Sequence, residues 1–281
     1  IPSPYPYRHE AGPHPDAVIA ASVAELKAKV EEIGAGNVAA FIAEPVQGSG
    51  GVIVPPDGWL KAMREACTEL DILFIADEVI TGFGRTGPMF ACEHEGVVPD
   101  IMTLAKGLTA GYAPMGAVVL SEKIYAGIAD GQRPGVPFGH GQTYSGHPVS
   151  AAVGLEVLRL YTEGGILANG ETSGAHFGSA LARLNDHPLV GEVRSKGLLA
   201  GIELVTDKAK KTKPASALEV PALLARIGYQ NGLIFRAFGD GVIGLAPPLT
   251  ITTDEIDLLV ARLGATLDEL LETKDIRDAL D

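Results

Sequence analysis

The stretch Leu73–Gly87, LFIADEVITGFGRTG, joins an apolar run to an acidic pair and a glycine-rich turn. A short apolar run that ends at turn residues is typical of a buried strand. Similar runs occur at residues 38–44, 101–107 and 116–121, and a helical pattern that starts near Asp57 lies between the first of them and Leu73. This alternation predicts an α/β fold with a mainly parallel sheet that is covered on both faces.

The same stretch contains two patterns of nucleotide-binding sites. The glycines from Gly82 to Gly87 spell G-x-G-x-x-G, but no helical period follows them, and Asp77 and Glu78 would place negative charge near a pyrophosphate. A P-loop ATPase needs G-x-x-x-x-G-K-[ST], and the glycines at 48–51 are not followed by lysine. Dinucleotide and nucleoside triphosphate binding therefore remain as weaker alternatives.

The length and composition of the chain predict a globular protein of about two domains, at roughly 150 residues per domain. Of its 281 residues, 46% are hydrophobic and 20% are charged, which favours a large packed core over disorder. Lys and Arg number 22 against 35 Asp and Glu, and the net charge of −13 argues against nucleic acid or an anionic membrane as partner. Apolar runs stay shorter than ~18 residues, so we expect no membrane span.

The chain has two cysteines, Cys67 and Cys92, and no CxxC motif. Two cysteines are too few for a disulfide framework, and no metal site is predicted. Cys67 shares a helical face with Leu60 and Met63, so we expect it to be a buried thiol. A reducing, cytoplasmic location fits this cysteine usage.

A change in composition divides the chain into two expected domains, residues 1–162 and 163–281. Two strand-rich stretches and flanking helices follow the division and indicate a smaller α+β domain. Thr252 and Glu255 form a capping box at the start of the last helix. Helices are expected at residues 15–33, 57–70, 147–165, 217–231 and 254–272.

Asp77 is the first candidate for chemistry, because it lies at the end of an apolar strand. Side chains alternate along a strand, so Ile75, Asp77 and Val79 are expected on one face at its carboxyl end, where open α/β sheets bind ligands. An acid beside a flat apolar side chain suits a protonated ring nitrogen. The competing interpretation, slightly favoured by this stretch alone, is that Asp77 only caps the following turn.

Lys106 is the second candidate, because it ends another apolar run and Gly107 follows it. A desolvated lysine at this place would have a nucleophilic neutral amine. The competing interpretation is that the side chain of Lys106 extends into solvent from the end of the strand. Asp77, Val79 and Lys106 together match the needs of pyridoxal phosphate (PLP), which takes a Schiff-base lysine and an acid at the pyridinium nitrogen.

Four segments, FIAEPVQGSGGVIVPP, LFIADEVITGFGRTG, PDIMTLAKGLTAGYAPMGAVV and HGQTYSGHP, resemble the class III PLP-dependent aminotransferases. The resemblance covers essentially the whole chain. It implies the aspartate-aminotransferase type of fold: a large αβα domain, a small α+β C-terminal domain and an obligate dimer. Members of this family carry a further N-terminal part with a phosphate-binding loop, and this chain starts at Ile1 in a Pro- and Tyr-rich segment. We therefore expect residues 1–162 to be the C-terminal part of the large domain.

The resemblance also assigns roles to individual residues. Lys106 is implied as the lysine that binds PLP and moves the proton, and Asp77 as the partner of the pyridinium nitrogen. Thr143 is implied to reach the cofactor phosphate of the neighbouring subunit. The cofactor-binding residues implied by the resemblance are Asp77, Val79, Ile80, Lys106, Gln142 and Thr143.

Three positions bear on the substrates, an amine and a 2-oxo acid. Many family members that use 2-oxoglutarate carry Glu where this chain has Ser49 and Gln where it has Ile80. The chain is more similar to the omega-amino-acid–pyruvate branch, in which an arginine matched by Arg236 can meet a substrate carboxylate. Transamination to pyruvate is the expected function. The alternatives are a 2-oxoglutarate-dependent aminotransferase, an aminomutase or decarboxylase of the same fold, or a fragment without catalysis.

Overall fold

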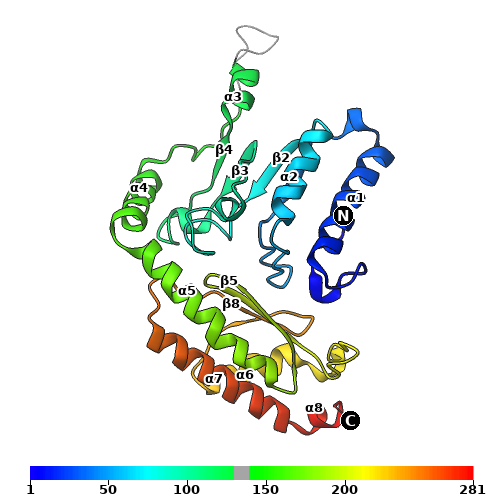
Figure 1. Cartoon of the computed structure of the whole chain (residues 1–281). Coiled ribbons are helices and arrows are strands. Elements are labelled where there is room, and N and C mark those ends of the chain that lie inside the picture. The colour runs from blue at the N-terminus through cyan, green and yellow to red at the C-terminus, as the bar shows by residue number, and fades with distance from the viewer. Residues whose placement is uncertain (130–138, 281) are drawn as a thin grey trace. The chain divides into compact units, whose positions relative to one another are not determined.

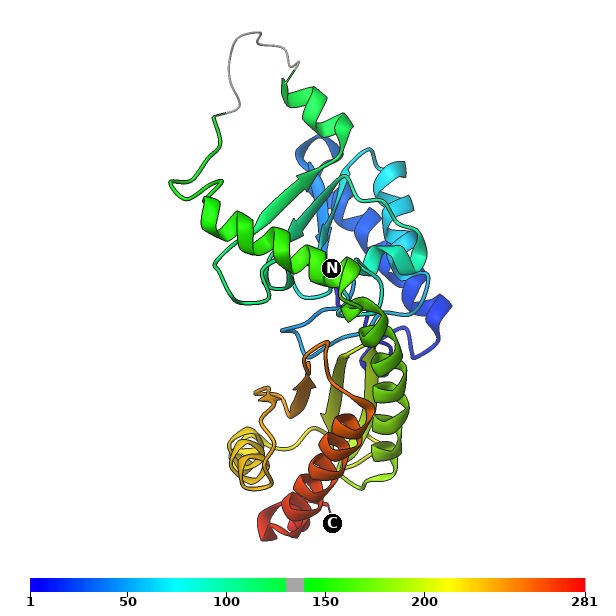
Figure 2. The same cartoon turned by 90° about the vertical axis from the view of Figure 1, so that its left-hand side faces the viewer.

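The computed structural model describes residues 1–129 and 139–280, which form two compact units. Figures 1 and 2 show their elements from two sides. The sequence predicts a division between residues 162 and 163, whereas the units divide at Ile166. Two short segments earlier in the chain also group with the second unit. The first unit comprises Ile1–Pro45, Pro55–Gly84 and Pro88–Ile166, and the second comprises Val46–Val54, Arg85–Gly87 and Leu167–Asp281.

The first unit contains a four-stranded sheet in the order β1-β2-β3-β4. Strands β1 and β2 and strands β2 and β3 are parallel, and β4 is antiparallel to β3. The mainly parallel sheet predicted from the alternating apolar runs is confirmed. The strands are β1 (Ala40–Ala43), β2 (Leu73–Asp77), β3 (Ile101–Leu104) and β4 (Ala117–Leu120).

Two helices, α1 (Pro15–Ile33) and α2 (Trp59–Glu69), pack against one face of this sheet. Their core includes Met63 and Phe74, both fully buried. The register places Ile42 beside Ile75 on the opposite face, where Ile42 is 56% exposed. Asp77 follows Ile75 by two residues and lies on this more open face.

The first unit contains further helices besides α1 and α2. Helix α1 ends before Gly34, as its periodicity predicts. Helices α3 (Glu122–Ala129) and α4 (Pro148–Glu163) follow the last strand. Short 3-10 helices cover η1 (Pro6–Arg8), η2 (Ala35–Asn37), η3 (Ala91–Glu95) and η4 (Lys106–Leu108).

The second unit contains an antiparallel sheet in the order β5-β6-β8-β7. Its helices pack on a core in which Phe177, Ile202, Ile243 and Leu263 are fully buried. The strands are β5 (Val190–Lys196), β6 (Leu199–Leu204), β7 (Arg236–Ala237) and β8 (Val242–Leu245). The helices are α5 (Ile166–Ala182), η5 (Arg183–Asp186), η6 (Ser216–Leu218), α6 (Val220–Gln230), α7 (Thr253–Glu272) and α8 (Lys274–Asp278).

In this unit, the sequence patterns predict helix α7 correctly but miss helix α5. The capping box of α7 is confirmed, because Glu255 N donates to Thr252 Oγ1 at 3.3 Å and Thr252 N donates to Glu255 Oε2 at 2.9 Å. Helix α5 is absent from the sequence-based prediction, because its glycines weaken the helical signal. Gly174 is needed there, since a Cβ would lie 2.9 Å from the Cα of Gly197 in the turn between β5 and β6.

Across the described parts of the chain, each helix is too short or too polar to cross a lipid bilayer.

Candidate active site

Asp77 and Lys106 lie at the carboxyl ends of two neighbouring parallel strands. Asp77 is in register with Thr103 of β3, and the next residue of its strand, Glu78, donates its N–H to Thr103 O at 3.1 Å. Lys106 follows Thr103 by three residues and begins η4. Parallel pairing therefore brings the acid and the lysine to the same edge of the sheet, as the sequence predicts.

The carboxylate of Asp77 is half-buried and also takes part in the turn that follows β2. Its Oδ1 accepts a hydrogen bond from Val79 N at 3.1 Å. The strand ends at Asp77, so Val79 lies in the turn and the strand alternation predicted from the sequence does not extend to it. Val79 and Ile80 are half-buried in this turn. Capping of the turn and a cofactor contact are thus compatible roles for Asp77, since a carboxylate has two oxygens.

The backbone at Lys106 is held in an uncommon conformation. Lys106 has a φ of 38°, in the left-handed region that non-glycine residues seldom occupy. Its side chain is exposed, so the described residues do not provide the desolvation that the sequence predicts for it. Non-glycine residues keep such a conformation where neighbouring structure holds it, and such positions cluster at functional sites.

The structure supplies the neighbours that hold this segment. A Cβ at Gly107 would lie 2.8 Å from Cβ and Cδ2 of Phe83, so the backbone of Gly107 sits directly on that side chain. The ring of Tyr161 stacks on Phe83 with centroids 5.9 Å apart, and its hydroxyl donates to Gly107 O at 2.9 Å. The sequence does not reveal Phe83 or Tyr161 as neighbours of Lys106 and Gly107, because both are distant from them along the chain.

Glu78 is a fully buried carboxylate beside Asp77. It accepts hydrogen bonds from Thr81 Oγ1, from Ala91 N at 3.1 Å and from Cys92 N at 2.8 Å. Burial, together with this carboxylate, raises the pKa of the Cys92 thiol well above its ordinary value. Glu78 therefore connects the turn after β2 to η3 through hydrogen bonds. The alternation of β2 places Glu78 on the face opposite Asp77 but does not reveal its partners.

Gln142 and Thr143 lie in an exposed turn before α4. Gln142 N donates to Ser145 Oγ at 2.9 Å, and Ser145 N donates to Gln142 O at 2.9 Å. His147 caps α4, because its Nδ1 accepts from Ser150 N at 3.4 Å. The turn has a defined shape and presents Gln142 and Thr143 to solvent.

The residues expected to select the substrate belong to the second unit. Ser49 is exposed in the segment Val46–Val54. Arg236 is exposed on β7, and its Cζ lies 5.4 Å from the centroid of the Phe238 ring. The chemistry expected at Lys106 and Asp77 and the recognition expected at Ser49 and Arg236 thus divide between the two units.

The residues of the first unit suit pyridoxal phosphate. A half-buried carboxylate at the end of β2 can pair with a protonated ring nitrogen, and an exposed lysine at the end of β3 can reach the aldehyde. The half-buried Val79 offers an apolar surface beside the carboxylate.

Comparison with protein families and known relatives gives one consistent family of matches. The model of the family described as aminotransferase class-III matches residues 2–267. The chain is 45% identical over 271 residues to the putrescine–pyruvate aminotransferase of Pseudomonas aeruginosa, covering 96% of this chain and 58% of the relative. It is 39% identical to the diaminobutyrate–2-oxoglutarate transaminase of Halomonas elongata, covering 87% and 54%.

Solved structures with the same fold include transaminases. An (S)-enantioselective omega-transaminase from Thermomicrobium roseum superposes with a TM-score of 0.91 at 44% identity, covering 96% of this chain and 60% of that structure. An amine transaminase from an uncultivated Pseudomonas species, in its PLP-bound internal aldimine form, gives a TM-score of 0.91 at 40% identity, covering 95% and 61%. The chain thus spans about 60% of the length of these proteins.

Proposed function

The chain belongs to the class III aminotransferases, a PLP-dependent family, and from this membership we propose that the complete protein moves an amino group from an amine or omega-amino acid to a 2-oxo acid. The observation that carries the proposal is the pairing of β2 with β3, which sets Asp77 in register with Thr103, three residues before Lys106. These two side chains supply the acid and the amine that this chemistry requires.

We assign the proton transfers to Lys106 and the control of ring charge to Asp77. PLP, when bound, supplies an electron sink for the charge that develops on the donor carbon. The Lys106 amine can take the proton from that carbon and return it as general base and acid. The negative charge of Asp77 favours the protonated state of a ring nitrogen next to it. Val79, whose N–H is bonded to Asp77, would then lie beside the ring.

We also propose that two copies of the protein share the site. The exposed turn at Gln142 and Thr143 offers the hydroxyl of Thr143, which is a suitable donor to a phosphate. Thr143 would bind the cofactor phosphate of the neighbouring subunit in a homodimer. A cytoplasmic location is proposed from the two free, buried cysteines, Cys67 and Cys92.

Pyruvate is the proposed acceptor. Ser49 lacks the carboxylate that would pair with an arginine, and Ile80 lacks the amide of glutamine, so the exposed Arg236 is free to receive a substrate carboxylate. The Pseudomonas aeruginosa relative, by its name, uses pyruvate, whereas the Halomonas elongata relative uses 2-oxoglutarate. 2-Oxoglutarate is therefore the alternative acceptor to be tested.

The decisive experiment measures product formation by the complete protein loaded with PLP. Incubation with a diamine such as putrescine and pyruvate should give alanine, and Lys106→Ala should give none. Replacement of pyruvate by 2-oxoglutarate should lower the rate. Faster formation of glutamate than alanine would exclude pyruvate as the preferred acceptor, and absence of both products with a panel of amines would exclude transamination.

A further inference from the structure

The segment Val46–Val54 is a closed hairpin with a fixed shape. Gln47 N donates to Ile53 O at 3.0 Å, and Ile53 N donates to Gln47 O at 2.9 Å. Within it, Val52 N donates to Gly48 O at 3.0 Å. Val52 and Ile53 are buried, whereas Ser49 at the tip is exposed. A side chain that binds the backbone of this hairpin therefore also fixes the position of Ser49.

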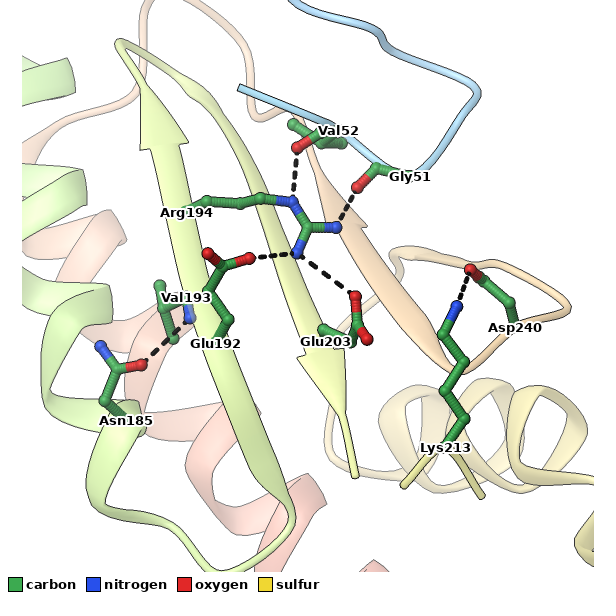
Figure 3. A network of polar contacts seen from close by, with 9 residues as sticks. All are labelled: Gly51, Val52, Asn185, Glu192, Val193, Arg194, Glu203, Lys213 and Asp240. Atoms are coloured by element: carbon green, nitrogen blue, oxygen red, sulfur yellow. Dashed lines mark hydrogen bonds and ion pairs between the residues drawn. The ribbon is translucent and has the colours of Figure 1, made fainter. Parts of the chain in front are cut away.

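Arg194 of β5 holds the hairpin from the sheet of the second unit (Figure 3). Its Nε donates to Val52 O at 2.7 Å, and its Nη2 donates to Gly51 O. Its Nη1 lies 2.9 Å from Glu192 Oε2 and 3.8 Å from Glu203 Oε2. Arg194 is 8% exposed and Glu203 is fully buried. One buried guanidinium thus binds two backbone carbonyls of the hairpin and two carboxylates of the sheet.

The backbone at the anchored point has a strained conformation. Val52 has a φ of 52°, a left-handed value that a β-branched residue adopts only where surrounding structure holds it. Gly51, with a φ of 110°, precedes it. Gly201 of β6 lies beneath, and a Cβ there would be 2.9 Å from Gly51 O and 3.1 Å from Arg194 Nε. The carbonyls reach Arg194 because this strand position has no side chain.

The register of the sheet connects this anchor to the strand of Arg236. Arg194 pairs with Gly201, Gly201 pairs with Gly244, and Gly244 pairs with Arg236. Residues directly opposite each other in a sheet project to the same face. The row therefore has an arginine at each end and two glycines between them, across about 14 Å at roughly 4.8 Å per strand. The hairpin that carries Ser49 lies on this row.

We propose that Arg194 is a positioning residue for substrate selection: it fixes the hairpin 46–54 on the sheet and so sets Ser49 on the same face as Arg236. The inference rests on the function proposed above, in which Ser49 and Arg236 select the 2-oxo acid. A displaced hairpin would move Ser49 and change the space and polarity offered to the acceptor carboxylate. The reacting groups Lys106 and Asp77, which belong to the other unit, would be unchanged.

The test must separate this role from simple neutralisation of the buried Glu203. Arg194→Lys does so, because an ammonium can still compensate a carboxylate but lacks the planar fork that binds both Val52 O and Gly51 O. Gly201→Ala gives an independent variant, since its methyl group would push Gly51 O away without altering any charge. Asp240→Asn is the matched control: it breaks the exposed 2.7 Å ion pair with Lys213 in the same unit, away from the hairpin.

Two readouts are made on the complete, PLP-loaded protein. Hydrogen exchange followed by mass spectrometry should show roughly tenfold faster exchange in peptides that cover residues 46–54 of Arg194→Lys and Gly201→Ala, with β8 peptides unchanged, because the loss of one hydrogen bond of ordinary net strength changes a local opening equilibrium by about this factor. The KM for pyruvate should rise by a similar factor, while the rate of the half-reaction with the amine donor stays constant. Asp240→Asn should change neither quantity.

Each result that contradicts the proposal refutes a different step of it. Unchanged exchange in residues 46–54 of both variants would show that Arg194 does not hold the hairpin. Equal acceleration in the hairpin and in β8 would make Arg194 only a stabiliser of the sheet, and faster hairpin exchange with an unchanged KM would remove its role in selection. If the wild-type protein forms no amino acid from any 2-oxo acid, the proposed function fails, while the exchange data still decide the anchoring.

Discussion

Gly107 rests directly on the side chain of Phe83, with no space for even one additional carbon between them. A Cβ at Gly107 would lie 2.8 Å from two carbons of Phe83, and Tyr161 both stacks on that ring and donates to Gly107 O at 2.9 Å. The next residue toward the N-terminus is Lys106, which has the left-handed φ of 38°. The packing beneath Gly107 therefore sets the backbone from which the lysine projects.

Gly107→Ala is predicted to destabilise the protein by about 1–3 kcal/mol, the usual cost of forcing a methyl group into a packed place. The same change should lower turnover, because the backbone of Lys106 would shift. Urea unfolding and steady-state rates measure the two effects. Gly36→Ala is the control, since nothing lies within 4 Å of the position of its Cβ. Equal stability of the two variants would show that the contact with Phe83 is loose.

Lys106→Ala is predicted to abolish transamination, because the amine that binds the cofactor and moves the proton would be lost. In the wild-type protein, borohydride reduction followed by peptide mapping should place a pyridoxyl group on Lys106. Lys123→Ala, at an exposed lysine of α3, should keep full activity and the same label. A pyridoxyl group on another lysine would exclude Lys106 from this role.

Asp77→Asn is predicted to raise the activation barrier by about 3–4 kcal/mol, comparable to the loss of a preorganised electrostatic group. Asparagine keeps the shape of the side chain and can still accept the hydrogen bond from Val79 N. Single-turnover rates with an amine donor measure the change. Asp71→Asn, at the exposed aspartate before β2, should leave the rate unaltered. A near-normal rate in Asp77→Asn would leave only the capping role for Asp77.

Arg236→Ala is predicted to weaken the binding of pyruvate and alanine by about 10- to 150-fold, which corresponds to the loss of a charge-assisted bond of roughly 1.5–3 kcal/mol. Amines without a carboxylate should react almost normally. Kinetic constants for both substrate classes distinguish these effects. Arg226→Ala, at an exposed arginine of α6, is the control. Equal losses with all substrates would make Arg236 a structural residue.

The stability of the protein is predicted to fall at alkaline pH because of Cys67. Burial raises the pKa of this thiol from 9.0 to about 11, an effect opposed in part by Arg64. The folded state binds the proton more tightly than the unfolded state, so the stabilisation is complete below pH 9.0 and is lost as the pH rises toward 11. Urea midpoints at pH 8 and pH 10 should differ less for Cys67→Ala than for the wild type. An identical pH dependence would contradict the shifted pKa.

Local sequence patterns predict much of the fold because they depend on neighbours within a few residues. Phe74, Ala76 and Glu78 share one face of β2, as strand alternation predicts, and this face is fully buried. The Thr252 capping box forms as expected. The placement of Asp77 and Lys106 at one sheet edge also follows from the sequence, because both end apolar strands and neighbouring parallel strands end at the same edge.

Contacts between distant segments are decided only by the tertiary structure. Arg194 and Val52 are 142 positions apart, and no periodicity in the sequence connects them. The same holds for the row from Arg194 to Arg236, which exists only in the register of four strands. Hydrophobic periodicity encodes which side of an element is buried, whereas the partner of each buried polar group depends on how the folded chain satisfies its hydrogen bonds. The sequence by itself thus determined the mainly parallel sheet and the position of Asp77 and Lys106 at its edge, and the tertiary structure decided which residues hold that edge in place.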